Sequence, residues 1–159
     1  RGGAPYQLFP TADSYMTICA ASQHFWAPVC ETLGCPDLID DPRFKTRADR
    51  VANNDELVEM LSPYFSAQTT AHWCAAFEKI GVPAGPVLNH VEALSDPQTL
   101  ARDMVVDVDH TAAGATRTLG VHVKLSETPG SVRRAAPVLG EHDGEVWADW
   151  LGDREQAAD

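Results

Sequence analysis

The chain has 159 residues and a formal net charge of −11. This length suits one ordinary domain, or a small domain with an appendage, and allows a substantial buried core. The excess of acidic residues argues against a nucleic-acid partner, because neutralising phosphate needs clustered lysine and arginine. No apolar stretch reaches the ~18 residues of a membrane helix, and no export signal opens the chain. We therefore expect a soluble, cytoplasmic protein that binds neither nucleic acid nor membrane.

The first predicted elements are a hairpin and a helix. Residues 6–9 and 14–20 are rich in aromatic and β-branched side chains and flank the turn sequence PTAD at 10–13, which predicts two paired strands. From Ser22, a plausible N-cap, apolar residues recur at three- and four-residue steps as far as Gly34. This spacing predicts an amphipathic helix that stops at the glycine.

A loop and two further helices follow. Residues 35–46 lack periodicity, apart from a single turn that would carry Phe44 into the core. Asp55 can cap the next helix, whose last turn should be distorted by Pro63. The helix after it should begin at Thr69 or Thr70 and end at Gly81.

The segment GVPAGPV at 81–87 contains two prolines and two glycines within seven residues. Proline fixes φ and lacks an amide donor, whereas glycine can adopt positive φ. The sequence predicts a helix stop followed by a short extended segment that cannot be a fully paired central strand. Taken alone, the segment is also consistent with a rigid connector.

The C-terminal half is predicted to hold shorter elements. Residues 90–94 and 97–102 suggest helical turns, and residues 104–110 and 117–121 suggest two strands joined across a turn at 113–114. Residues 128–137 have a linker composition. Residues 139–151 then form an amphipathic pattern whose two tryptophans should dock on the chain's own domain or on a missing partner.

This order of elements predicts an α+β fold rather than an alternating, doubly wound sheet. We expect a small domain with a short, mainly antiparallel sheet and flanking helices, followed by a linker and a C-terminal helix. The corresponding boundaries are 1–127 for the small domain, 128–137 for the linker and 138–159 for the helical segment.

Several short motifs occur together in a fixed order. They are GAPY at 3–6, PTAD at 10–13, DPRF at 41–44 with Asn53 and Asp55, GVPAGPV at 81–87, DP at 96–97, RDMV at 102–105, KLS at 124–126 and LGEH at 139–142. Each motif alone is weak. In this order they resemble the family III CoA-transferases, which include formyl-CoA transferase, the carnitine and bile-acid CoA-transferases and α-methylacyl-CoA racemase. Two positions depart from the family pattern, Ser14 for glycine and Asp143 for threonine.

The resemblance implies a two-domain enzyme that moves CoA between carboxylic acids. Its large, Rossmann-like domain would be made from both ends of the polypeptide, this region would form the small domain, and two chains would interlock as a homodimer. An aspartate of the large domain would attack the acyl-CoA thioester. That aspartate would lie upstream of Arg1, so this chain is expected to be a fragment that is inactive alone. Acyl-CoA would be a substrate, with no permanently bound cofactor.

Site residues are carried over only at Gly2 and Gly3. The resemblance implies that they end a glycine-rich loop over the active site, where small residues permit close approach to acyl-CoA; a frayed terminus is the alternative. No catalytic residue is expected in the chain. Its scattered aspartates suit turns, and His142 suits helix capping better than general base catalysis.

Metal and disulfide sites are not expected either. The histidines share no ligand spacing such as HExxH. The four cysteines lie in apolar runs without a CxxC pair, and we interpret them as reduced, buried thiols. They are Cys19, Cys30, Cys35 and Cys74.

Two other functions stay open at this stage. The intact protein could epimerise a 2-methylacyl-CoA, which needs acid and base residues instead of a nucleophile. Alternatively, the chain could be a non-catalytic ligand-binding or interaction module. The acyl group and its acceptor are not specified by the sequence.

Overall fold

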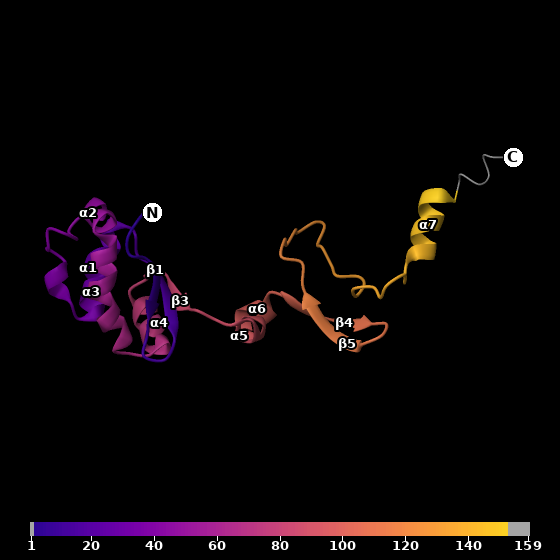
Figure 1. Ribbon diagram of the computed structural model, residues 1–159, viewed down its shortest axis with the longest axis horizontal. Coiled ribbons are helices and arrows are strands. Elements are labelled where there is room, and N and C mark those ends of the chain that lie inside the picture. The colour runs from indigo at the N-terminus through magenta and orange to yellow at the C-terminus, as the bar shows by residue number, and fades with distance from the viewer. Residues whose placement is uncertain (1, 153–159) are drawn as a thin grey trace. The chain divides into compact units, whose positions relative to one another are not determined.

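The computed structural model describes residues 2–152. Within them the chain forms two compact units, which divide between Val87 and Leu88 (Figure 1). The first unit contains β1 (Tyr6–Pro10), β2 (Tyr15–Cys19), α1 (Gln23–Leu33), the 3-10 turn η1 (Pro36–Leu38), α2 (Arg47–Ala52), α3 (Asn54–Ser66), α4 (Thr70–Lys79) and β3 (Ala84–Pro86). The second contains α5 (His90–Ser95), α6 (Pro97–Ala101), β4 (Val105–His110), β5 (Gly114–Leu119) and α7 (Asp143–Leu151). Short antiparallel sheets with flanking helices confirm the predicted α+β class.

The N-terminal hairpin forms as predicted. Strands β1 and β2 pair antiparallel, with Leu8 opposite Thr17. The turn between them is held by side-chain oxygens: Thr11 Oγ1 accepts a hydrogen bond from the Ser14 amide at 3.0 Å, and Asp13 Oδ1 accepts from the Thr70 amide at 2.8 Å. These bonds explain how the turn forms with Ser14 in the position where the family pattern has glycine. They also fasten the hairpin to the start of α4.

The helices of the first unit agree with the predictions except near residues 47–55. Helix α2 was not predicted, although Thr46 and Asp49 form a reciprocal capping box at its start. The expected cap of α3, Asp55, is wrong, because Asn53 occupies that position. The Asn53 side chain makes no cap bond, and its Nδ2 atom donates to the carbonyls of Arg43 and Asp49. Helix α3 also continues past Pro63 to Ser66.

The proline-glycine segment is an edge strand, as its composition indicated. Gly81 has a φ of +68°, which a residue with a side chain adopts only with strain. Strand β3 follows and pairs antiparallel with β2 alone, so the order of the sheet is β1-β2-β3. A three-residue edge strand satisfies the restriction that proline imposes on sheet pairing.

Aromatic side chains fill the core of the first unit between the sheet and the helices. Phe9 of β1 stacks on Phe65 of α3 at a centroid distance of 4.3 Å. Phe65 also meets Trp73 and Phe77 of α4 at 5.9 and 6.0 Å. Such pairs contribute about 0.5–1.5 kcal/mol each beyond the area they bury. The buried Trp73 indole donates to the Phe65 carbonyl at 2.8 Å, so the two helices are joined by a polar contact as well.

Arg50 of α2 is a fully buried cation at the side of this core. Its guanidinium donates to the carbonyls of Ala4 (3.0 Å) and Phe44 (2.9 Å) and to Gln23 Oε1 (3.1 Å). It also lies 4.8 Å from the centroid of the Trp26 ring. Burial lowers the pKa of Arg50. The residue therefore connects the N-terminal segment, α1 and the loop before α2.

The second unit is built on the β4–β5 hairpin, in which Val105 is paired with Leu119. Residues 120–142 form no helix or strand. Helix α7 begins four residues later than predicted, at Asp143. The delay coincides with Gly140, whose φ of +78° is not helical, and with a turn in which the Glu141 amide donates to the Val138 carbonyl at 3.1 Å.

Replacing Arg50 should strongly destabilise the first unit. The Arg50→Met variant fills the space but leaves several buried oxygens without donors, so we expect a loss of about 3 kcal/mol in unfolding free energy. Urea unfolding followed by circular dichroism measures this. Arg117→Met, at an exposed ion pair with Asp107, is the control and should cost less than about 1 kcal/mol. Equal losses in the two variants would contradict the structural role of Arg50.

Asp13 should make stability sensitive to acid. Hydrogen bonds, chiefly from the Thr70 backbone, lower the pKa of Asp13 from its ordinary 3.8. Because the folded-state pKa is lowered, the contribution is complete above pH 3.8 and is lost as the pH falls through the folded-state value. When unfolding midpoints are measured against pH, Asp13→Asn should show a smaller loss of stability below pH 3.8 than the unmodified chain. The control is Asp109→Asn, at an exposed position of β4. It changes the net charge equally and should lose as much stability in acid as the unmodified chain.

Candidate functional site

The two glycines expected to contact substrate lie just before β1, in different surroundings. Gly2 is exposed, and a Cβ atom added there would meet nothing within 4 Å. Its carbonyl accepts a hydrogen bond from Arg47. Gly3 is buried, and an added Cβ would lie 2.3 Å from the Cβ of Ala21. Packing alone therefore accounts for Gly3, whereas packing places no demand on Gly2.

Two neighbouring concavities adjoin this segment, and Asp55 lines both of them. The first, of about 430 Å³, is lined by Gly3 and by residues 51–56 at the junction of α2 and α3. The second, of about 650 Å³, lies against the outer side of β1 and is lined by Tyr6, Gln7, Leu8, Asp55, Val58 and Glu59. Together they form the candidate site of the first unit.

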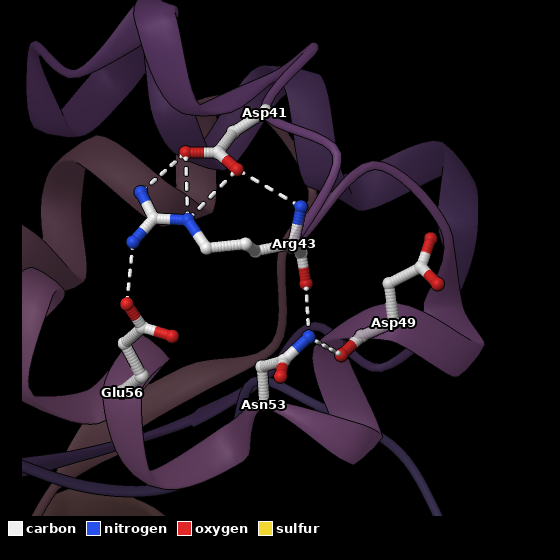
Figure 2. Close-up of polar contacts among 5 residues, drawn as sticks. All are labelled: Asp41, Arg43, Asp49, Asn53 and Glu56. Carbon is white, nitrogen blue, oxygen red and sulfur yellow. Dashed lines mark hydrogen bonds and ion pairs between the residues drawn. The ribbon is translucent and has the colours of Figure 1, made fainter.

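A polar network fixes the wall of the first concavity (Figure 2). Arg43 donates through Nε to Asp41 Oδ1 at 3.0 Å and through Nη2 to Asp41 Oδ2 at 2.6 Å. Its other nitrogen, Nη1, pairs with Glu56 in the first turn of α3. Asn53 donates to the Arg43 carbonyl at 2.9 Å and to the Asp49 carbonyl at 3.1 Å. The network joins the DPRF motif to Asn53, two of the features on which the resemblance rested.

The electrostatics of the network leave no free cation. The Arg43 side-chain hydrogen bonds hold the pKa of Asp41 below its usual value, and the same bonds, with Glu56, raise the pKa of Arg43. The guanidinium is therefore neutralised by two carboxylates. Asp55, Glu56 and Glu59 add negative charge to the two concavities. Such a surface favours neutral hydrogen-bonding or apolar groups and disfavours phosphate or carboxylate ligands.

Asn54 belongs to the site but was not singled out from the sequence. Its Oδ1 atom is buried and accepts no hydrogen bond from the described residues, while its Nδ2 donates weakly to Asp55 at 3.4 Å. An unpaired buried acceptor costs about 1–3 kcal/mol. The only sequence signal for this position was its place between Asn53 and Asp55, both of which are family marks.

The remaining groups considered from the sequence have structural surroundings in the part of the chain that the structure describes. No cluster of three metal-ligating side chains occurs among residues 2–152, and no helix in that range is long and apolar enough to cross a bilayer. Asp13 is occupied by hydrogen bonds in the hairpin turn. His142 lies 3.7 Å from Glu145 at the start of α7.

Known proteins show what the chain is similar to. Residues 1–143 match the model of CoA-transferase family III. The human succinyl-CoA:glutarate CoA-transferase is 37% identical over 147 residues, covering 92% of this chain and 34% of the human protein. The acetyl-CoA:oxalate CoA-transferase of Acetobacter aceti is 39% identical over 123 residues, covering 77% and 30%. The chain thus spans about a third of the length of these curated relatives.

The fold agrees with this match. The crystal structure of a CAIB/BAIF family protein from Brucella suis superposes with a TM-score of 0.73 at 29% identity, covering 93% of this chain and 38% of that one. Sequence similarity, fold and the ordered motifs all indicate the same family. The chain belongs to family III of the CoA-transferases.

Proposed function

We propose that the chain is the small-domain region of an enzyme that transfers CoA between carboxylic acids. The observation that carries this proposal is the family match over residues 1–143, together with relatives named for CoA transfer to glutarate and to oxalate. The candidate site is consistent with a supporting role. Its lining includes Asp55, Glu56 and Glu59, and the Arg43 guanidinium is paired with two carboxylates, so we expect most of the contacts to the phosphates of CoA and to the acid substrate to lie elsewhere in the intact enzyme.

The proposed chemistry is nucleophilic catalysis by a carboxylate. An aspartate outside this chain attacks the thioester carbonyl, forms an acyl-enzyme anhydride and releases the CoA thiolate. The thiolate then attacks the aspartyl carbonyl of the anhydride, which releases the donor acid and leaves an enzyme-CoA thioester. The acceptor carboxylate attacks that thioester and forms a second anhydride, and the returning thiolate attacks its acyl carbonyl to give the new acyl-CoA and the free aspartate.

Within this scheme Gly2 and Gly3 would form the part of the chain that approaches acyl-CoA. The open surroundings of Gly2 support the idea, since no packing demand explains a glycine there. Asn54 lies in the concavity that Gly3 lines, and its unpaired Oδ1 would accept a hydrogen bond from an uncharged N–H or O–H group. Acyl-CoA would act as a substrate, without a permanently bound cofactor.

The proposed organisation follows the same assignment. Residues 1–127 would form the small domain, and residues 128–137 would be a linker that returns the chain to the large domain. Residues 138–159 would belong to that large domain. The intact enzyme would be a cytoplasmic homodimer. The exposed tryptophans of α7 support this, because Trp147 is 58% and Trp150 77% exposed. An apolar helix face of this kind gains free energy when a partner covers it.

Chemical trapping should separate transfer from epimerisation. We expect the full-length protein, incubated with succinyl-CoA and treated with hydroxylamine or borohydride, to give an aspartyl hydroxamate or a reduced adduct detectable by mass spectrometry. Loss of α-deuterium from a 2-methylacyl-CoA without any adduct would indicate a racemase instead. The 159-residue chain alone should give neither, and turnover by this chain would refute the proposed role of a distant aspartate.

The two glycines should respond differently to enlargement. In the full-length protein, Gly2→Val should leave the unfolding midpoint unchanged but lower kcat/KM for acyl-CoA at least about tenfold, because a side chain displaces the ligand. Gly3→Val should lower the unfolding midpoint, because its side chain collides with Ala21. If Gly2→Val retains full activity, Gly2 does not contact the substrate.

A further inference from the structure

The C-terminus of α1 brings two cysteines together. Gly34 follows the helix with a φ of +79° and donates to the Glu31 carbonyl at 3.2 Å, while the Cys35 amide donates to the Cys30 carbonyl at 2.9 Å. This pair of bonds defines a Schellman motif over the six residues 30–35. An apolar contact between the first and last residues of such a motif is frequent. In this chain both of those residues are cysteine.

The two side chains are buried and in contact. Cys30 is 0% and Cys35 4% exposed, and they occupy the two positions whose side chains meet in a Schellman motif. Both cysteines are free thiols in this structure. The 2.9 Å hydrogen bond from the Cys35 amide to the Cys30 carbonyl brings the two backbone positions together, and close approach of the two residues is the main geometric requirement for a disulfide.

A buried positive charge lies near the pair. Arg50 donates to carbonyl and amide oxygens and, among the described residues, forms no ion pair with a carboxylate. Its charge acts to lower the pKa of the Cys30 thiol. The thiol–thiol hydrogen bond dominates, however, and raises the pKa of Cys30 while it lowers that of Cys35. Cys35 is thus the better nucleophile of the two.

We propose that Cys30 and Cys35 form a dithiol oxidation site, which hydrogen peroxide or a disulfide oxidant converts into an intramolecular disulfide that closes the end of α1. The sequence predicted reduced, buried thiols; all four cysteines are free thiols, but only Cys30 and Cys35 are buried, and Cys19 and Cys74 are half-buried. The geometry adds that these two thiols, unlike Cys19 on β2 and Cys74 on α4, have each other as a bonding partner.

The reaction balances with peroxide as oxidant. The Cys35 thiolate attacks one peroxide oxygen, the O–O bond breaks, and the second oxygen leaves as hydroxide and takes up a proton to become water. The Cys30 sulfur then attacks the resulting sulfenic acid of Cys35, forming the S–S bond and releasing a second water. Two thiols lose two electrons and two protons in total, and one peroxide is reduced to two waters.

Peptide mapping of the folded, full 159-residue chain tests the proposal directly. After treatment with a small excess of hydrogen peroxide, we expect the intact mass to fall by two hydrogen atoms. Alkylation after unfolding should label Cys19 and Cys74 but neither Cys30 nor Cys35. Cleavage after Glu31, which lies between the pair, should give two peptides that stay joined until a reductant is added.

Matched variants provide the controls. The Cys19→Ser/Cys74→Ser double variant should form the same linkage to the same extent, whereas Cys35→Ser should lose it. Should Cys35→Ser not fold, the map of the double variant decides alone. Free Cys30 and Cys35 after oxidation, their conversion to sulfinic or sulfonic acids, or a linkage of either one to Cys19 or Cys74 would overturn the proposal.

Discussion

The first unit depends on one interaction, the burial of the Arg50 guanidinium. A charge that leaves water must have its donors satisfied, and here the acceptors come from three separate parts of the chain: the carbonyl before β1, the loop after η1, and a glutamine at the start of α1. The cation therefore fixes where each segment runs. The Gly2–Gly3 segment and the Arg43 network occupy the surface that these bonds hold in place.

A second set of polar contacts has the same character but lies at the opposite end of the hairpin. Thr11, Asp13 and Thr70 close the β1–β2 turn and at the same time begin α4. Between these two polar clusters, stacked aromatic rings join the sheet to α3 and α4. Directional bonds thus set the arrangement of the elements, and apolar burial supplies most of the stability.

The sequence predicted elements that carry strong local signals. The hairpin, α1, α4 and the edge strand β3 have clear periodicity or distinctive glycine and proline positions. Other elements lacked such signals. Helix α2 has only six residues, which are too few for a periodic pattern. The N-cap of α3 could not be foreseen either, because Asn53 makes no side-chain cap bond and its Nδ2 atom binds the carbonyl of Arg43, ten residues earlier in the chain. Asn54 was missed for a related reason: its burial depends on how α2 meets α3. The Schellman contact between Cys30 and Cys35 has a local signal, the glycine between them, but the thiols' contact became evident only from the hydrogen-bonded backbone.

Strand β3 also determines how the sheet ends. Its neighbour on one side is β2, which bonds to the Pro83 carbonyl and the Val87 amide, so the nitrogen of Pro86 removes an amide donor from the other side. An additional strand would find few N–H groups to bind there. The β3 edge is consequently a poor place to add a further strand, so extension of this sheet by backbone pairing would have to occur at β1, which forms the other edge.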